Sequence, residues 1–231
     1  MDAFDAGKRR ARICGELKRM TKKKSDISLD KFVAAAHSAA AHGLLQCSSG
    51  NMSWRINDEV AVVTASRSWL ERLTKDDVVI CRTADGEVLN NKTPSAESRF
   101  HLGILRSRKD VNVILHFQSP YATAITCSSK RDYNFFVLPE IPFYIGAIGW
   151  VDFFMPGSEE LAMATIEAAK RHTIVLLQNH GQVVIGKDFD DAIQNACFFE
   201  LACRILLTNP AAAAIKQDNI ERLKAARIGN I

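Results

Sequence analysis

The sequence predicts a single α/β domain, and two observations support this prediction. The chain has 231 residues, of which 47% are hydrophobic and 24% charged, as is typical of one globular domain. Segments with strand-like and helix-like patterns alternate from end to end, without an internal repeat or a proline-rich linker. We divide the chain into a basic helical extension, residues 1–26, and one domain, residues 27–231.

The N-terminal extension is strongly basic. Residues 8–24 contain nine Lys or Arg against the single acid Glu16, and phosphates bind such charge through counterion release. The other interpretation is a solvated helix face, with Ile13, Leu17 and Met20 at helical spacing. We favour the second, because no aromatic side chains interleave with the charges to stack on bases. We therefore expect neither a nucleic-acid nor a membrane partner.

Cysteine usage and hydropathy indicate the compartment. No run of eighteen apolar residues is present, and Lys8, Arg9, Arg10 and Arg12 interrupt any signal-peptide core. The six cysteines are scattered and form no CxxC pair, which argues against both a disulfide framework and a structural zinc site. The sequence predicts a cytoplasmic protein with reduced thiols.

The first half of the domain reads as a helix followed by strands. Residues 28–45 have the pattern of an amphipathic helix that Ser28 or Asp30 could cap and Gly43 could end. A Ser/Gly/Asn loop in residues 47–56 runs into a strand. Two further β segments follow: a buried strand in residues 59–66 and a hairpin in residues 77–90 around an Asp-Gly turn.

The second half alternates between the two kinds of element. The sequence predicts a helix over 95–108, a strand over 111–117, two strands around a tight turn over 173–186 and a helix over 189–207. Residues 133–156 are aromatic and irregular, and the pattern assigns no element to them.

Two stretches combine small hydroxyl residues with a position suited to anions. In Ser48-Ser49-Gly50-Asn51-Met52-Ser53, glycine lets the backbone approach a phosphate, although such strings are usually loops. In Thr93-Pro94-Ser95-Ala96-Glu97, Ser95 or Thr93 could simply cap the next helix. The functional alternative is a phosphate at that helix N-terminus, with Glu97 as a general base.

Two other stretches place a histidine at the end of a buried strand. Strand alternation puts His116 and Gln118 on the same face, roughly 6.6 Å apart, a spacing at which two histidines often chelate a metal. His180 precedes a glycine on a sharp turn, where its ring can project clear of the sheet. A lone strand histidine is more often a hydrogen-bonded core residue, and we interpret the remaining histidines, including His101, as structural.

Taken in order, these stretches resemble the class II aldolase/adducin family. The resemblance runs from about Phe32 to Leu207 and is carried by SSGNMSWRI, VVTAS, TPSAESRFHLGILRSRKDVNVILHFQSPYATA and LLQNHGQVVIGKDFDDAIQNACFFELA. It implies a three-layer αβα fold around a central, mostly antiparallel sheet. It also implies a homotetramer with active sites between subunits.

The resemblance implies roles for particular residues. Asn51, Ser66 and Ser95 correspond to the substrate-phosphate ligands, and Glu97 to the catalytic carboxylate. His116 and His180 correspond to two of three zinc ligands. Tyr144 is the candidate for the tyrosine, often from the adjoining subunit, that protonates the leaving oxygen, with Phe143 as the alternative match.

The chain departs from the family pattern at three positions. Gln118 stands where the middle histidine ligand is usual, so the metal is either Zn²⁺ or another divalent ion. Arg67 replaces a phosphate-loop glycine and Ala96 a serine.

The implied activity is cleavage of a ketose 1-phosphate, such as L-fuculose 1-phosphate, to dihydroxyacetone phosphate and an aldehyde such as lactaldehyde. A pentulose-5-phosphate 4-epimerase and a non-catalytic adducin-like interaction protein are the alternatives. The presence of Glu97, His116 and His180 favours an enzyme.

Overall fold

A seven-stranded sheet forms the centre of the molecule in the computed structural model, which describes residues 29–228. Its strands lie in the order β3-β2-β1-β4-β7-β6-β5, and every neighbouring pair is antiparallel except β5 and β6. The strands are β1 (Asn51–Arg55), β2 (Val60–Thr64), β3 (Val78–Arg82), β4 (Val113–Phe117), β5 (Ile148–Val151), β6 (Ile174–Leu177) and β7 (Gly181–Gly186).

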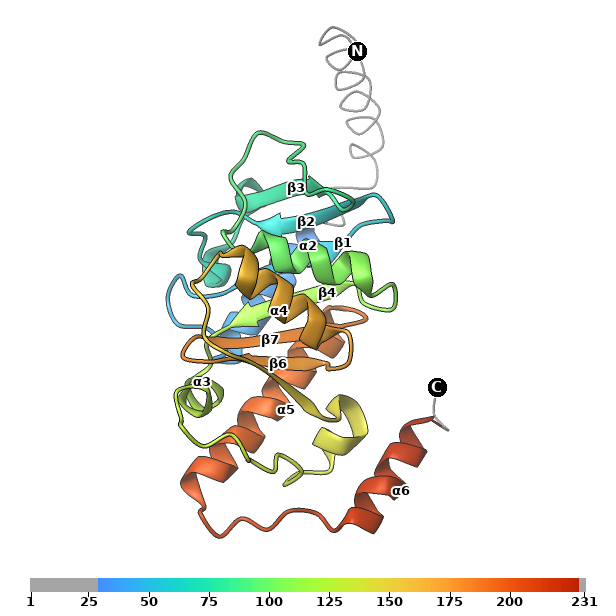
Figure 1. Cartoon of the computed structure of the whole chain (residues 1–231). Coiled ribbons are helices and arrows are strands. Elements are labelled where there is room, and N and C mark those ends of the chain that lie inside the picture. The colour runs from blue at the N-terminus through green and yellow to red at the C-terminus, as the bar shows by residue number, and fades with distance from the viewer. Residues whose placement is uncertain (1–28, 229–231) are drawn as a thin grey trace, which may run out of the picture.

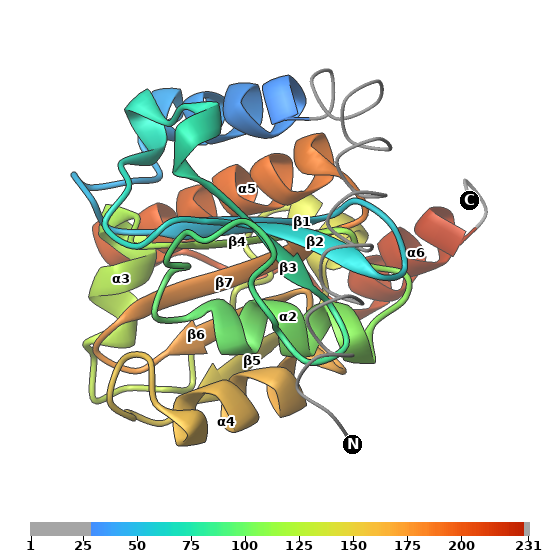
Figure 2. The ribbon, with the colours of Figure 1, turned by 90° about the horizontal axis from the view of Figure 1, so that it is seen from above.

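Helices cover both faces of this sheet and complete three layers (Figures 1 and 2). The helix of residues 29–41 and α5 lie on one face, and α2 and α4 on the other. The α-helices with assigned bounds are α2 (Ser98–Ser107), α3 (Pro120–Thr126), α4 (Glu159–Ala169), α5 (Phe189–Thr208) and α6 (Gln217–Ile228). The short turns are η1 (Leu70–Arg72), η2 (Lys75–Asp77) and the π-helical turn η3 (Ile141–Ile145).

Strand alternation divides the interior into two cores. In β4, Leu115 and Phe117 join the core beneath α5, whereas Ile114 joins the core beneath α2 and α4. His116 has the same parity as Ile114, so its side chain belongs to the α2 face of the sheet. The same alternation puts Asn51, Ser53 and Arg55 of β1 on that face.

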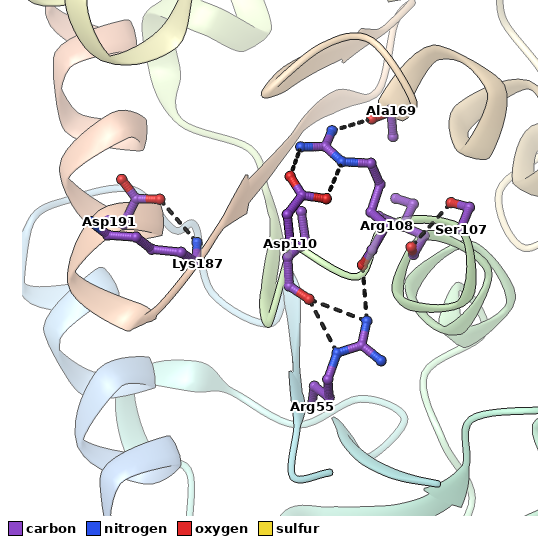
Figure 3. A network of polar contacts seen from close by, with 9 residues as sticks. Arg55, Ser107, Arg108, Asp110, Ala169, Lys187 and Asp191 are labelled. Carbon is purple, nitrogen blue, oxygen red and sulfur yellow. Dashed lines mark hydrogen bonds and ion pairs between the residues drawn. The ribbon is translucent and has the colours of Figure 1, made fainter. Parts of the chain in front are cut away.

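Arg55 ties β1 to the C-terminal end of α2 (Figure 3). Its buried guanidinium donates to the carbonyl oxygens of Leu105 and Arg108, the latter at 3.0 Å, and its Nε donates to Val111 O at 3.2 Å. The last carbonyls of a helix lack intrahelical donors. A buried cation there donates the missing hydrogen bonds and interacts favourably with the negative end of the helix dipole. This contact holds α2 in a defined place over β1.

The structure confirms the predicted fold class and most of the predicted elements. The helix predicted over residues 28–45 is observed over residues 29–41, and Gly43 follows its end with a φ of 72°. The predicted hairpin of residues 77–90 turns back on β3, with Leu89 N–H donating to Ile80 O and Arg82 N–H to Glu87 O, but its second half makes only an isolated bridge, Cys81 to Val88, and no assigned strand. The sequence patterns did not identify α3, α4, β5 or α6. The basic extension of residues 1–26 lies outside the described residues.

No helix among the described residues is long and apolar enough to cross a membrane. The five cysteines in this part of the chain, Cys47, Cys81, Cys127, Cys197 and Cys203, are free thiols.

Candidate metal centre

One carboxylate and two imidazoles converge at the end of two central strands of the sheet, β4 and β7. Glu97 Oε2 lies 3.2 Å from His116 Nε2, and Glu97 Oε1 lies 3.3 Å from His180 Nε2. The potential ligand atoms of the three residues all lie within 4.8 Å of one another. Two imidazoles with a carboxylate form a donor set that suits a divalent transition-metal ion.

Three different elements bring these side chains together. His116 lies near the end of β4, where it pairs with Asn51 of β1. His180 sits in the tight turn between β6 and β7, which Asn179 makes possible with a φ of 54°. Glu97 is the N-cap residue of α2, so the carboxylate faces the positive end of the helix dipole. The assigned N-cap position is therefore Glu97 and not the predicted Ser95 or Thr93, although Ser95 Oγ accepts the Glu97 N–H at 3.3 Å, as a capping hydroxyl does.

A backbone contact orients His116. The Nδ1 atom of its ring lies 3.0 Å from the carbonyl oxygen of Gln182 on β7. Since a carbonyl only accepts, Nδ1 donates to it, and this contact fixes the ring with Nε2 directed at Glu97. A hydrogen bond on the opposite ring nitrogen is the usual way in which proteins orient a metal-binding histidine.

Burial controls the charge state of the group. Burial lowers the pKa of His180 to about 4, with His116 adding to this effect and Glu97 opposing it. Burial alone would raise the pKa of Glu97, but His116, the Asn51 amide and His180 outweigh it, and the Glu97 pKa lies below its ordinary value. The site therefore presents a carboxylate and a neutral His180 ring at pH 7, which are the forms that bind metal ions.

Two atoms at the centre lack hydrogen bonds. Glu97 Oε1 and His180 Nδ1 are buried and have no hydrogen-bond partner among the described residues. Leaving buried polar atoms unsatisfied is costly, and native proteins usually do so where a ligand or ion completes the site. The unsatisfied Oε1 beside two imidazoles is the observation that fits a divalent ion here.

Gln118 lies beside this group. It is half-buried, and a Cβ built on Gly181 would stand 2.8 Å from its Cγ, so its side chain runs over the turn that carries His180. The chain after Gln118 is held firmly: Ser119 Oγ donates to Glu200 of α5 at 2.6 Å and accepts from the Gln182 side chain. Metal ligation by Gln118 remains a prediction.

The three predicted phosphate ligands occupy two environments. Ser66 and Ser95 flank an isolated bridge between Ala65 and Pro94, which brings their loops together next to Glu97. Asn51 is almost buried, and both ends of its amide are engaged: Nδ2 donates to Glu97 Oε2 at 2.9 Å, and Oδ1 lies 2.5 Å from His101 Nε2. Phosphate binding by these residues stays a prediction.

Arg67 adopts the backbone conformation of the glycine that it replaces. Its φ is 63°, which is unusual for a side-chain-bearing residue. The loop therefore has a glycine-like backbone at a residue that carries a guanidinium.

Tyr144 lies apart from the three converging side chains within one chain. It belongs to η3 and stacks on Phe198 of α5, with ring centroids 5.8 Å apart. Since α5 covers the opposite face of the sheet from α2, Tyr144 would reach a site like this one only in a neighbouring subunit.

Two polar residues outside the predicted site, His101 and Ser53, lie next to Asn51 and Glu97. His101 is fully buried in α2, one turn after Glu97, and its Nδ1 lies 2.8 Å from Ser53 Oγ. The sequence contained a signal for them. Asn51 and Ser53 are two residues apart and so share one face of a strand, and Glu97 and His101 are four residues apart and so share one face of a helix.

Comparisons with known proteins agree with this geometry. The model of the Class II Aldolase and Adducin N-terminal domain matches residues 30–207. A 3-oxo-tetronate 4-phosphate decarboxylase of Haemophilus influenzae is 31% identical over 163 residues, covering 69% of this chain and 77% of that protein. An L-fuculose phosphate aldolase of Methanocaldococcus jannaschii is 33% identical over 162 residues, covering 70% and 86% respectively.

Solved structures show the same fold. YgbL of Escherichia coli, for which aldolase, epimerase and decarboxylase activities have been suggested, superimposes with a TM-score of 0.81 at 26% identity, covering 87% of this chain and all of that one. With the sheet order, the Glu97–His116–His180 group and these relatives in agreement, the chain belongs to the class II aldolase and adducin family, whose enzymes are lyases that use a divalent metal ion.

Proposed function

We propose that the chain is a metal-dependent lyase that breaks a carbon–carbon bond beside the ketone of a phosphorylated sugar and releases dihydroxyacetone phosphate. The observation that carries this proposal is the buried Glu97 carboxylate, which lies within 3.3 Å of both His116 and His180. An ion held by His116 and His180, with Gln118 as a candidate third ligand and zinc as the first candidate ion, would supply Lewis-acid stabilisation of negative charge on the substrate oxygens.

Glu97 is placed to move the carbon-bound proton. Bond cleavage leaves an electron pair on the carbon beside the ketone, and a proton must be delivered there; the Glu97 carboxylate would take up this proton from solvent and pass it to the carbon. Oε2 of Glu97 is engaged by Asn51, whereas Oε1 accepts no hydrogen bond from a described residue. We assign the proton transfer to Oε1, a role usually worth on the order of 10²–10⁴ in rate.

The first candidate reaction is the aldol cleavage of a ketose 1-phosphate, with L-fuculose 1-phosphate as the first candidate, to dihydroxyacetone phosphate and lactaldehyde. This reaction needs a group that takes the proton from the hydroxyl that becomes the aldehyde, and we propose Tyr144 of an adjoining subunit in a homotetramer. Exposed apolar side chains near the site support an interface there. Phe153 and Met155 are 52% and 67% exposed, and the loop that carries them abuts Ala96 through Gly157.

The second candidate reaction is a decarboxylation. It is favoured by the contacts of the three tyrosines within one chain, which are with residues other than Glu97, His116 and His180. Tyr121 lies beneath Arg204, the Tyr133 hydroxyl donates to Ser128, and Tyr144 stacks on Phe198.

Decarboxylation of a 3-oxo-tetronate 4-phosphate requires no such group, because the departing carboxylate carries no proton that must be removed. Loss of that carboxylate and protonation of the adjoining carbon also yield dihydroxyacetone phosphate. Glu97 therefore has the same task in both reactions.

One assay with several substrates tests the proposal and separates its candidates. Purified protein is incubated with L-fuculose 1-phosphate, L-rhamnulose 1-phosphate, ribulose 5-phosphate and 3-oxo-tetronate 4-phosphate. Dihydroxyacetone phosphate with lactaldehyde identifies the aldolase, and the same product with carbon dioxide identifies the decarboxylase. Conversion of ribulose 5-phosphate to its epimer alone would contradict both.

Metal content provides the independent check. We expect one divalent ion per chain in the wild type, and loss of that ion in His116→Ala and His180→Ala. His42→Ala is the matched control, because His42 is exposed at the end of the first described helix. Wild-type protein with far less than one ion per chain, and no uptake of zinc, manganese or cobalt, would rule out the metalloenzyme. The free thiols support the expected cytoplasmic location.

A further inference from the structure

A chain of hydrogen bonds leads away from Glu97 into the interior between β1 and α2. Asn51 Nδ2 donates to Glu97 Oε2 at 2.9 Å, His101 Nε2 lies 2.5 Å from Asn51 Oδ1, and Ser53 Oγ lies 2.8 Å from His101 Nδ1. Ser53 and His101 are fully buried, and Asn51 and Glu97 are nearly so. Water therefore does not compete for these bonds.

Only one arrangement of protons satisfies the whole chain for a neutral His101 ring. A carboxylate only accepts, so the NH₂ group of Asn51 must face Glu97 and its Oδ1 must face His101. His101 Nε2 must then carry a proton, which leaves Nδ1 to accept from the Ser53 hydroxyl. Burial lowers the pKa of His101 to about 3, with His116 adding to this effect and Glu97 opposing it, which supports the neutral ring.

The consequence is a difference between the two oxygens of Glu97. Oε2 is held by the Asn51 amide, while Oε1 has no hydrogen-bond partner among the described residues and lies 3.3 Å from His180 Nε2. The amide of a free asparagine turns over readily, because its two ends have almost the same shape. His101 prevents this, since its N–H would face the NH₂ group in the turned orientation.

We propose that Ser53 and His101 are positioning residues that fix the orientation of the Asn51 amide and thereby hold Glu97 with its Oε1 atom directed at the substrate. This inference rests on the proposed function of Glu97. Neither residue touches substrate in the proposal. Each acts through Asn51, as supporting residues do in other metal centres.

A purely structural role is the competing explanation, and Arg55 provides the control for it. Residues 51, 53 and 55 of β1 advance by about 6.6 Å per step, close to the roughly 6 Å of four helical residues. They accordingly meet α2 near its beginning, middle and end. Arg55 binds only carbonyl groups at the far end. It therefore contributes to the same packing without contacting Glu97 or Asn51.

The test compares His101→Leu, His101→Gln and Arg55→Lys with the wild type. In His101→Leu we expect kcat to fall by about 10- to 100-fold, with KM and bound metal within about twofold. In His101→Gln the side-chain amide can still donate to Asn51 Oδ1, so we expect most of kcat to return. Arg55→Lys should lower the unfolding temperature and leave the kcat of folded protein within about twofold. Ser53→Ala is the milder variant should His101→Leu not fold, and its kcat should fall in the same manner.

A second readout does not depend on turnover. In metal-free protein at pH 7, the ¹⁵N spectrum of the imidazoles should show His101 with Nε2 protonated and Nδ1 bare, the signal being assigned by its absence in His101→Gln. A cationic ring or the opposite tautomer would overturn the inference, as would full kcat in the folded leucine variant. A wild type without lyase activity would instead overturn the proposed function, so the two failures are distinguishable.

Discussion

Acidification should destabilise the metal-free protein through His101. The ring is fully buried, and its pKa of about 3 lies well below the ordinary value of 6.5. Between these two values the unfolded chain binds a proton at this histidine and the folded chain does not. The stability that the neutral ring retains above pH 6.5 is therefore lost progressively as the pH falls toward 3.

The size of the effect follows from the pKa difference. Each pH unit below 6.5 costs about 1.4 kcal/mol in the free energy of unfolding, so a change from pH 8 to pH 5 should cost about 2 kcal/mol. Many carboxylates also titrate near the end of this range, so the wild type alone does not isolate the contribution of His101. His101→Gln has no titrating group at that position and serves as the reference.

The assay is urea unfolding of both proteins at pH 8, 7, 6 and 5 in the presence of a chelator. The unfolding free energy of the wild type should decline more steeply than that of His101→Gln, with an excess loss of about 2 kcal/mol by pH 5. Parallel curves for the two proteins would show that His101 is protonated in the folded state or is not shielded from water, and would refute the reasoning.

Three further predictions concern the centre itself. Glu97→Gln should lower kcat by about 10²–10⁴ while the protein retains its metal, measured by turnover and metal analysis; unchanged kcat would remove Glu97 from proton transfer. Gln118→His should tighten zinc binding by at least about tenfold in a competition titration, since even residues that only support ligands change affinity by that factor; unaltered affinity would place residue 118 away from the ion. Gly181→Ala puts a Cβ 2.5 Å from Phe117 O and should cost about 1–3 kcal/mol in thermal unfolding; an unchanged unfolding temperature would contradict the close approach of β7 to β4.

Position and residue type singled out Glu97, His116 and His180 as candidates, and the resemblance to a family gave them their expected roles, which stay predictions. His116 and His180 each follow a run of buried apolar residues, and Glu97 precedes a helix, so all three were expected at the ends of elements. That they meet depends on the sheet order, which pairs β4 with β7 across a long stretch of sequence. The strand order was not predicted: the resemblance to a family implied a mostly antiparallel sheet without an order, and the local pattern contained no information on it.

The supporting residues were predicted less well, for a physical reason. Ser53 and His101 are 48 positions apart and acquire their roles only when α2 lies over β1. Either residue alone has the appearance of an ordinary core or surface residue. In the same way, β5 has only four residues and pairs in parallel with β6, so neither its length nor its composition distinguished it from a loop.

The candidate centre is built on the N-terminus of α2, the end of β4 and the turn preceding β7, and β4 and β7 lie in the middle of the sheet. Neither edge strand contributes a side chain to the Glu97, His116 and His180 group. Fraying of a sheet begins at its margins, where backbone groups have a neighbour on one side only. Escape of a bound ion through fraying of the sheet would therefore require β4 and β7 to separate, and loss by that route should occur only on the time scale on which the entire domain unfolds.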